Sequence, residues 1–371
     1  MAVNTIKGVP DDSRFSYHVT KGRNCDLHPP PPAFFCHPVL TAMKRYLPDT
    51  FTLMLLSTVL LATLLPATGV FENVMHLASN TAIALLFFLH GARLSRDAAL
   101  SGFKQPRLHL LTLSSTFILF PLLGLALQAL FPGLLTPDLW LGVLFVCTLS
   151  STVQSSIAFT SIARGNVPAA ICGATASNLL GIVITPILVT LLLHRHQDGG
   201  GIEQVTGILL QLLLPFVLGN VLRPWIGDWV LRKKSLLAVV DRGGILLAVY
   251  AAFSAAVVQG VWHLFPPQQL GLLVLVNAIL LGGVLMLTTF GSRALGFSRE
   301  DEIVLVFCGS KKSLASGIPM ASVLFSSTGV GIVLLPIMVF HQMQLMLCAV
   351  LARRYAERAD EKEAREAGII V

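Results

Sequence analysis

The sequence predicts an all-α polytopic membrane protein with about ten transmembrane helices, arranged as two inverted five-helix repeats. Three observations predict this class. Hydrophobic residues make up 54% of the 371-residue chain and charged residues only 12%, whereas soluble domains carry about 25% charged residues. Apolar segments long enough to cross a bilayer follow one another along most of the chain. Short motifs also recur five segments apart.

The apolar segments have the length of membrane-spanning helices. A bilayer-crossing helix needs roughly 20 predominantly apolar residues. Turn-like or charged stretches, such as Phe131-Pro132-Gly133 and Phe265-Pro266-Pro267, separate the segments. We expect helices near residues 50–66, 74–92, 108–131, 139–162, 168–193, 204–222, 236–260, 269–290, 302–325 and 329–351.

Lysine and arginine are distributed asymmetrically over the predicted loops. One set of alternate loops carries nearly all of them, and the opposite set carries only Arg195. The positive-inside rule then predicts that both termini are cytoplasmic and that the protein is integral to the cell's inner (plasma) membrane. The net charge of +7 arises in these loops, beside lipid headgroups, and does not indicate a nucleic-acid partner.

Two matching motifs predict an internal repeat. Residues 181–189 (GIVITPILV) and 331–339 (GIVLLPIMV) share six of nine positions. The motifs lie five spans apart, and an odd number of spans places the halves in opposite orientations, as in many secondary transporters. We therefore predict a disordered tail at residues 1–42, a first repeat at 43–195, a second repeat at 203–352 and a cytoplasmic tail at 353–371.

Spans four and nine carry polar runs in mid-membrane. Residues 150–156 read SSTVQSS and residues 309–313 read GSKKS. Hydroxyl, amide and carbonyl oxygens suit small hard cations, and unwound backbone at this depth is tolerated only where it lines a cavity or is buried in protein. Small residues that pack helices together are the alternative. The candidate site residues are Thr152, Gln154, Ser155, Ser156, Thr175, Asn178, Ser310, Lys311, Lys312 and Ser313.

Lys311 and Lys312 are the most informative pair in the sequence. A lysine at mid-bilayer costs roughly 2.5–3.5 kcal/mol on insertion scales. The pair could bind an anionic substrate, act as a titratable coupling group, or occupy a cation position as a fixed charge. Alternatively, span nine begins later and both lysines reach cytoplasmic water.

Other chemistry finds little support in the sequence. The six cysteines show no metal-ligand spacing. Neither a phosphate-binding loop nor a nucleophile elbow nor a His-Glu-x-x-His motif occurs, so we expect no enzyme activity, catalytic residue or cofactor. Isolated polar residues in the spans, including Asn277, His341 and Gln344, are interpreted as interhelical hydrogen-bonding groups.

Several motifs resemble those of the bile acid:sodium symporter family, over roughly residues 43 to 355. The likeness is strongest to the seventh-member branch and the bacterial proteins grouped with it. The motifs are Ser155-Ser156, Gly165-Asn166, Thr175-x-Ser177-Asn178, Thr185-Pro186, residues 86–91 (LFFLHG) with Leu94-Ser95, and residues 307–315 (FCGSKKSLA).

The resemblance implies a fold with a core domain of spans three to five and eight to ten and a panel domain of spans one, two, six and seven. Helices four and nine would be broken and would cross. Substrate would bind between the domains, and sodium would bind in the core. By motif position, Ser155, Ser156, Thr175 and Asn178 match residues that hold one sodium ion.

Span nine departs from the family pattern. The well-described symporters carry an acidic residue and a Gln-Asn pair where this chain has Lys311 and Lys312. The expected function is sodium-coupled symport of a small organic anion by alternating access. The alternatives are a cation/proton antiporter that uses Lys311 or Lys312, and an ion-binding membrane regulator linked to calcium homeostasis that transports nothing.

Overall fold

The computed structural model describes residues 50–93, 105–193, 202–258, 260, 266–325 and 327–366. The predicted disordered tail at 1–42 lies outside these residues. Every regular element in the described part is helical, so the predicted all-α class is confirmed. The elements are α2 (Thr50–Leu64), α3 (Val70–Arg93), α5 (Pro106–Ser114), η2 (Ser115–Leu119), α6 (Phe120–Leu130), α7 (Pro137–Thr148), α8 (Val153–Ile162), α9 (Val167–Leu193), α10 (Ile202–Arg232), α11 (Lys234–Val258), α13 (Pro267–Ala294), α14 (Arg299–Gly309), α15 (Leu314–Leu324) and α16 (Ser327–Glu366).

Several helices are long and apolar enough to span a membrane. Six described helices meet this condition alone, and α7 with α8 forms a seventh candidate that is bent by 65°. Helix α2 is apolar but short, with 15 residues. Helices α14 and α15 occupy the predicted ninth span, which carries charged residues in both its first turn and its middle. The count of ten spans and the inverted repeat therefore stay predictions.

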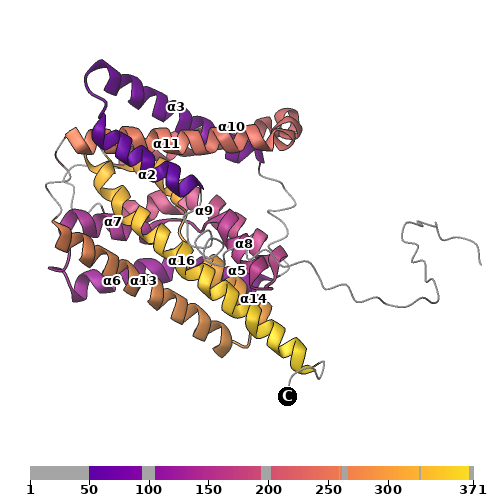
Figure 1. Cartoon of the computed structure of the whole chain (residues 1–371). Helices are drawn as coiled ribbons and strands as arrows, with labels where there is room; N and C mark the ends of the chain where they lie inside the picture. Colours follow the sequence, from indigo (N-terminus) through magenta and orange to yellow (C-terminus); the bar gives the residue numbers. More distant parts are fainter. Residues whose placement is uncertain are drawn as a thin grey trace, which may run out of the picture. The chain divides into compact units, whose positions relative to one another are not determined.

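The helices of residues 49–371 form two groups (Figure 1). Helix α3 packs against α10 and α11, and α2 packs against α11. The contact between α3 and α10 is close: a Cβ on Gly91 would lie 1.9 Å from the Phe216 carbonyl oxygen, and one on Gly219 would lie 1.9 Å from the Phe88 oxygen. Small residues allow such backbone contact between membrane helices. The second group contains α5 to α9 and α13 to α16.

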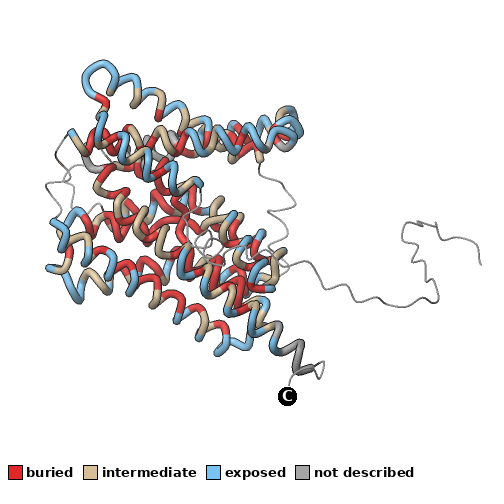
Figure 2. The backbone as a smooth tube through the Cα atoms, in the orientation of Figure 1, coloured by how far each residue is buried: buried red, intermediate tan, exposed pale blue. Residues whose placement is uncertain are grey.

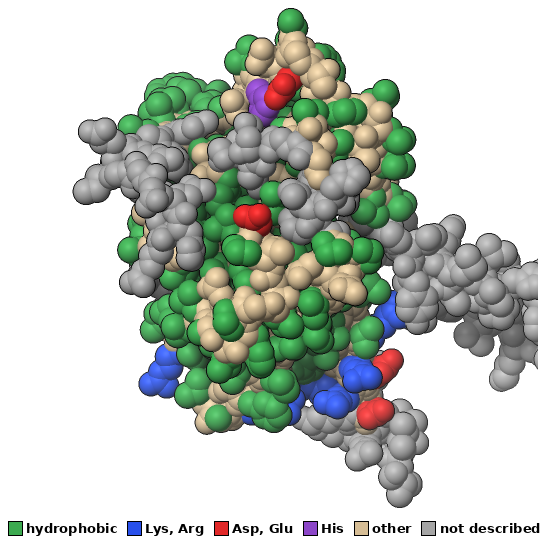
Figure 3. All heavy atoms as spheres, turned by 90° about the vertical axis from the view of Figure 1, so that its left-hand side faces the viewer, with side chains coloured by type: hydrophobic (Ala, Val, Ile, Leu, Met, Phe, Trp, Pro, Cys, Tyr) green, Lys and Arg blue, Asp and Glu red, His purple; other side chains and the backbone are tan. Residues whose placement is uncertain are grey.

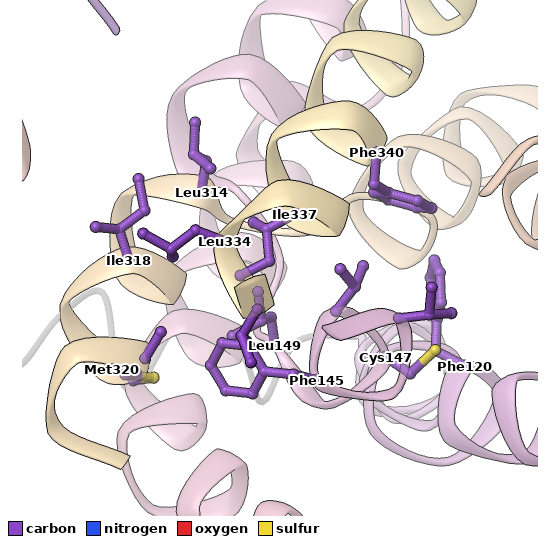
Figure 4. Packing of buried hydrophobic residues seen from close by; sticks show 14 of the residues in the cluster. Phe120, Phe145, Cys147, Leu149, Leu314, Ile318, Met320, Leu334, Ile337 and Phe340 are labelled. Carbon is purple, nitrogen blue, oxygen red and sulfur yellow. The ribbon is translucent and has the colours of Figure 1, made fainter. Parts of the chain in front are cut away.

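The main apolar core lies within the second group. Figure 2 shows buried backbone concentrated where helices face each other. Figure 4 shows Leu149, Phe145, Ile318 and Leu334 packed around the ends of broken helices, with the Phe120 and Phe340 rings in edge contact nearby. Hydrophobic side chains cover most of the face in Figure 3, and lysine and arginine gather at its lower end. This pattern suits a protein whose outer surface meets lipid.

Three of the helical segments are interrupted near their middle. Helix α7 ends at Thr148, where Leu149 turns to extended backbone, and α8 begins after Thr152. Helix α14 ends at Gly309, and α15 begins after Ser313, whose side chain accepts the Ser316 N–H. The π-helix η2 separates α5 from α6. Such interruptions frequently mark functional sites, because they release backbone groups from the helical ladder.

Helix α16 continues without a break past residue 353, where we predicted the start of the cytoplasmic tail. Ala352 and Tyr355 are buried. The Tyr355 hydroxyl donates to Glu302 Oε1 over 2.6 Å, and Arg293 forms two 2.9 Å hydrogen bonds with the same carboxylate. The first part of the predicted tail is therefore packed against the start of α14.

Candidate ion and substrate site

The breaks in the two interrupted helices meet in the interior of the protein. The Ser313 N–H donates to the Ser150 carbonyl oxygen over 2.8 Å, and the Thr152 hydroxyl donates to the Lys312 carbonyl oxygen over 3.0 Å. Ser150, Ser151 and Ser310 are fully buried. The two non-helical segments, 149–152 and 310–313, thus form hydrogen bonds to backbone carbonyls of each other. We call this place the crossover.

Helix α16 holds the crossover through one amide side chain. Gln344 Oε1 accepts the Lys312 N–H, and Gln344 Nε2 donates to the Lys312 carbonyl oxygen, both over 2.8 Å. His341 Nδ1 lies 2.9 Å from the same Nε2. Gln344 makes an interhelical hydrogen bond, as its position in an apolar span indicates. Nothing in the sequence predicts that Gln344 binds both the N–H and the carbonyl oxygen of Lys312.

The ammonium of Lys312 is enclosed by backbone carbonyls. The side chain is 1% exposed. Its Nζ donates to the carbonyl oxygens of Thr116, Cys147 and Leu149 over 2.7, 2.8 and 2.8 Å. The Phe120 ring covers another side, with its centroid 4.1 Å from Nζ. Each of the three ammonium N–H groups therefore has an acceptor.

Lys311, the next residue, has a different environment. It is 0% exposed, and its Nζ has no hydrogen-bond partner. The ammonium lies over the Phe159 ring at 3.7 Å from the centroid, with the Phe307 ring at 5.8 Å. The thiols of Cys308 and Cys348 are close enough to interact with it electrostatically. Neither lysine reaches solvent in this conformation, contrary to the alternative in which span nine begins later.

The predicted sodium ligands lie on α8 and α9, beside the crossover. Ser155 Oγ is buried and has no partner. Ser156 donates to the Phe307 carbonyl oxygen over 3.1 Å, and Asn178 Oδ1 accepts from Ser150 over 3.2 Å. Thr175 is half-buried, whereas Gln154 is exposed. Hydrogen bonds connect Asn178 to Ser150 and Ser156 to Ser151 at the crossover, over 3.2 and 3.5 Å, but they do not join the four predicted ligands to one another.

Several participants at the crossover were not among the predicted residues. Ser150 contacts both Asn178 and the Ser316 hydroxyl, at 3.2 Å each. Ser177 accepts the Ser151 N–H over 3.0 Å. The remaining participants are backbone carbonyls, which any residue type supplies. The sequence held a partial signal for a released carbonyl next to Thr116, because Pro121 cannot donate the N–H that the Phe117 carbonyl would accept in a regular α-helix.

Comparison with known proteins shows the family of this chain. A family model described as the SBF-like CPA transporter family matches residues 49–357. The chain belongs to this family. An uncharacterized protein of Pseudomonas aeruginosa is 57% identical over 321 residues, which are 86% of this chain and 96% of that protein.

Two further relatives carry functional names. The Escherichia coli protein named "Putative symporter YfeH" is 52% identical over 318 residues, covering 86% of this chain and 96% of its own. The rat protein named "Sodium/bile acid cotransporter 7" is 29% identical over 276 residues, covering 74% and 81%. The predicted likeness to the bile acid:sodium symporter family is confirmed, and the SBF-like chain is an integral membrane protein of a transporter family.

Proposed function

We propose that this chain is a secondary active transporter that moves a small organic anion by alternating access and couples it to sodium. In this proposal ten spans form two inverted repeats in the inner (plasma) membrane, with both termini cytoplasmic. The crossover would be the fixed point about which the two helix groups move. The family and the relatives' names support transport; the coupling ion and the anion are our inference.

One observation carries the proposal: two helices break at facing points deep in an apolar protein, and the breaks hydrogen-bond to each other. Unwound backbone inside a membrane protein is expensive unless it is buried or lines a site. Secondary transporters with inverted repeats place their ligand sites at such breaks. Here the breaks gather buried hydroxyls, carbonyls and two lysines.

The oxygens of α8 and α9 fit a small monovalent cation. Ser155 Oγ is buried and unpartnered, which is the state expected of a ligand atom that awaits an ion. Asn178 Oδ1 accepts from Ser150 and Ser156 Oγ lies 3.5 Å from Ser151 Oγ, so both oxygens contact residues of the crossover. The described residues contain no group of three or more His, Cys, Asp or Glu that could hold a metal ion. Neutral oxygens without such a group favour sodium over a divalent ion.

The charge of the site favours an anionic solute. Two lysines are buried at the crossover, and only Lys312 has its hydrogen bonds satisfied. An anion near Lys311 would supply the acceptor that its ammonium lacks. In our proposal Lys311 attracts the organic anion, with Ser310, Ser313 and Thr152 on the neighbouring backbone.

Sodium binding tests the coupling ion. Purified protein in detergent is heated at increasing sodium chloride, against equal potassium or choline chloride. A ligand that binds only the native state raises the unfolding temperature in proportion to the logarithm of its concentration. We expect a sodium-specific rise that is lost in Ser155→Ala and Asn178→Ala. Ser322→Ala is the matched control, because its hydroxyl only donates to a helical carbonyl within α15. Equal responses to all three salts would remove sodium from the proposal.

Proton coupling is a second candidate, favoured by the unpartnered ammonium of Lys311. Burying a charged ammonium without an acceptor is costly, and release of a proton relieves that cost. The titratable groups that face it are Cys308 on α14 and Cys348 on α16. Antiport predicts a pH change inside dye-loaded proteoliposomes on addition of sodium without organic solute, and its loss in Lys311→Met. Ion binding without either flux would instead support a regulator.

A further inference from the structure

We propose that Lys312 is a tethered cation: its ammonium permanently fills a cation site built from three backbone carbonyls. No exchangeable ion would then bind at this place in the native chain. Removing the side chain would uncover a site for a small monovalent cation or a primary alkylammonium ion. The consequence for ion stoichiometry rests on the function proposed above, whereas the occupancy of the site does not.

Each of the three carbonyls has lost its helical donor for an identifiable reason. In an α-helix the Thr116 oxygen would accept the N–H of residue 120, but Phe120 donates to the Ser115 oxygen instead. The donor one residue further on, which a π-helix would use for the Thr116 oxygen, is Pro121, and proline has no N–H. The Cys147 oxygen would accept from Ser151, whose N–H donates to Ser177 Oγ. The Leu149 oxygen lies in the break between α7 and α8.

The geometry matches the needs of a cation. The three Nζ–oxygen distances lie between 2.7 and 2.8 Å, as in charge-assisted hydrogen bonds. Phe120 presents its ring face to the same ammonium at 4.1 Å. A buried backbone carbonyl without a hydrogen-bond partner costs free energy comparable to a lost hydrogen bond. The site therefore needs a positive group, and the chain supplies one covalently.

The tether also explains how the crossover is held. The acceptors come from η2 and from the end of α7, whereas Lys312 itself lies between α14 and α15. Gln344 fixes the backbone of the same residue from α16. A mobile ion would join these elements only while bound. A lysine joins them at every sodium concentration.

The neighbouring residue supplies a matched control for the test. Lys311→Ala removes the same side chain from an equally buried position where no carbonyl accepts a hydrogen bond from it. Both variants and the unchanged protein are purified in potassium-free, sodium-free choline buffer. Thermal unfolding is then followed while methylammonium, propylammonium, sodium or tetramethylammonium is added as the chloride.

We expect Lys312→Ala to unfold at a lower temperature than the unchanged protein. Methylammonium or propylammonium should raise this temperature saturably and restore about half or more of the difference, because a ligand that binds the native state stabilises it by mass action. Tetramethylammonium, which has no N–H donor, should fail. Lys311→Ala and the unchanged protein should show no response to the alkylammonium ions. A folded Lys312→Ala that no cation stabilises would overturn the proposal, as would equal rescue of Lys311→Ala.

Lys312→Met tests the same idea if the alanine variant does not fold. Methionine keeps the chain length and fills the space but leaves three carbonyls without a donor. We expect a lower unfolding temperature than that of the unchanged protein, with no recovery in any of the salts. An unfolding temperature equal to or above that of the unchanged protein would show that the carbonyls need no cation. If alkylammonium ions stabilise Lys312→Ala but sodium does not stabilise the unchanged protein, the tethered cation stands and only the proposed sodium coupling is contradicted.

Discussion

At the scale of single residues, adjacent lysines in one non-helical segment have opposite surroundings. Lys312 faces three carbonyls, and Lys311 faces two aromatic rings and two thiols. The sequence indicated that both lysines were buried for a purpose and left open which one faced the site. It could not separate them, because the difference depends on carbonyls released in spans three and four.

The two lysines should respond differently to replacement by methionine. Lys311→Met exchanges an unpartnered ammonium for an apolar group against the Phe159 ring, so stability should be unchanged or higher, as when buried charges are replaced by hydrophobic residues. Lys312→Met leaves three buried carbonyls unpaired, at about 1–3 kcal/mol each before relaxation. Unfolding of both variants in detergent measures the difference. A larger loss of stability for Lys311→Met would contradict the assignment.

Gln344 should be as important for the crossover as the lysine that it holds. Gln344→Glu keeps the size of the side chain but replaces the N–H donor with an oxygen that faces the Lys312 carbonyl. We expect a loss of roughly 1–3 kcal/mol, the usual penalty for an unsatisfied buried group. Thermal unfolding of Gln344→Glu, beside Gln268→Glu at an exposed position near the start of α13 as a surface control, checks this. Equal stability of the two variants would show that the hydrogen bonds from Gln344 to Lys312 are unimportant.

At the scale of elements, helix positions followed from apolar segment length, whereas the breaks in spans four and nine were implied by the family resemblance and supported by the polar runs. The hydrogen bonds between the breaks could not be predicted, since they depend on how distant segments pack. The π-helix in span three was also missed. Pro121 was its only local indication, and a proline in an apolar span is more often interpreted as a kink.

The contact between α3 and α10 gives a prediction at this scale. Gly91→Ala places a methyl group 1.9 Å from the Phe216 carbonyl oxygen, so the two helices must separate. We expect loss of stability of a few kcal/mol, as for other overpacked sites, and loss of transport if the helix pair moves as a unit. Gly243→Ala is the control, because a Cβ there meets nothing within 4 Å. Normal unfolding of Gly91→Ala would show that the close contact is not required.

At the scale of the whole molecule, composition was enough to predict a helical membrane protein, and the motifs were enough to predict the family. The number of spans depends on more than helix length. Helix α2 is short, and spans four and nine each consist of two helices with a break. Length and apolarity alone support six or seven spans among the described residues. The positive-inside pattern and the repeat supply the reasons for ten.

Reporter fusions test the ten-span topology. Loops after an odd number of spans carry only Arg195 of the lysines and arginines and should lie outside the cytoplasm. Alkaline phosphatase fused after residue 135 or residue 265 should therefore be active, and fusions after residue 165 or residue 297 should be inactive. A cytoplasmic position for residue 135 or residue 265 would contradict both the count of ten and the opposite orientation of the halves.

The most direct test of the central claim is sodium-driven uptake of organic anions. Right-side-out membrane vesicles containing the protein are incubated with a mixture of small organic anions, and their contents are identified by mass spectrometry with an inward sodium gradient or equal potassium. The account predicts that one chemical class of anion accumulates only with the sodium gradient and is absent from Asn178→Ala vesicles. Accumulation that follows a pH gradient regardless of sodium, or no anion that depends on the protein, would contradict it.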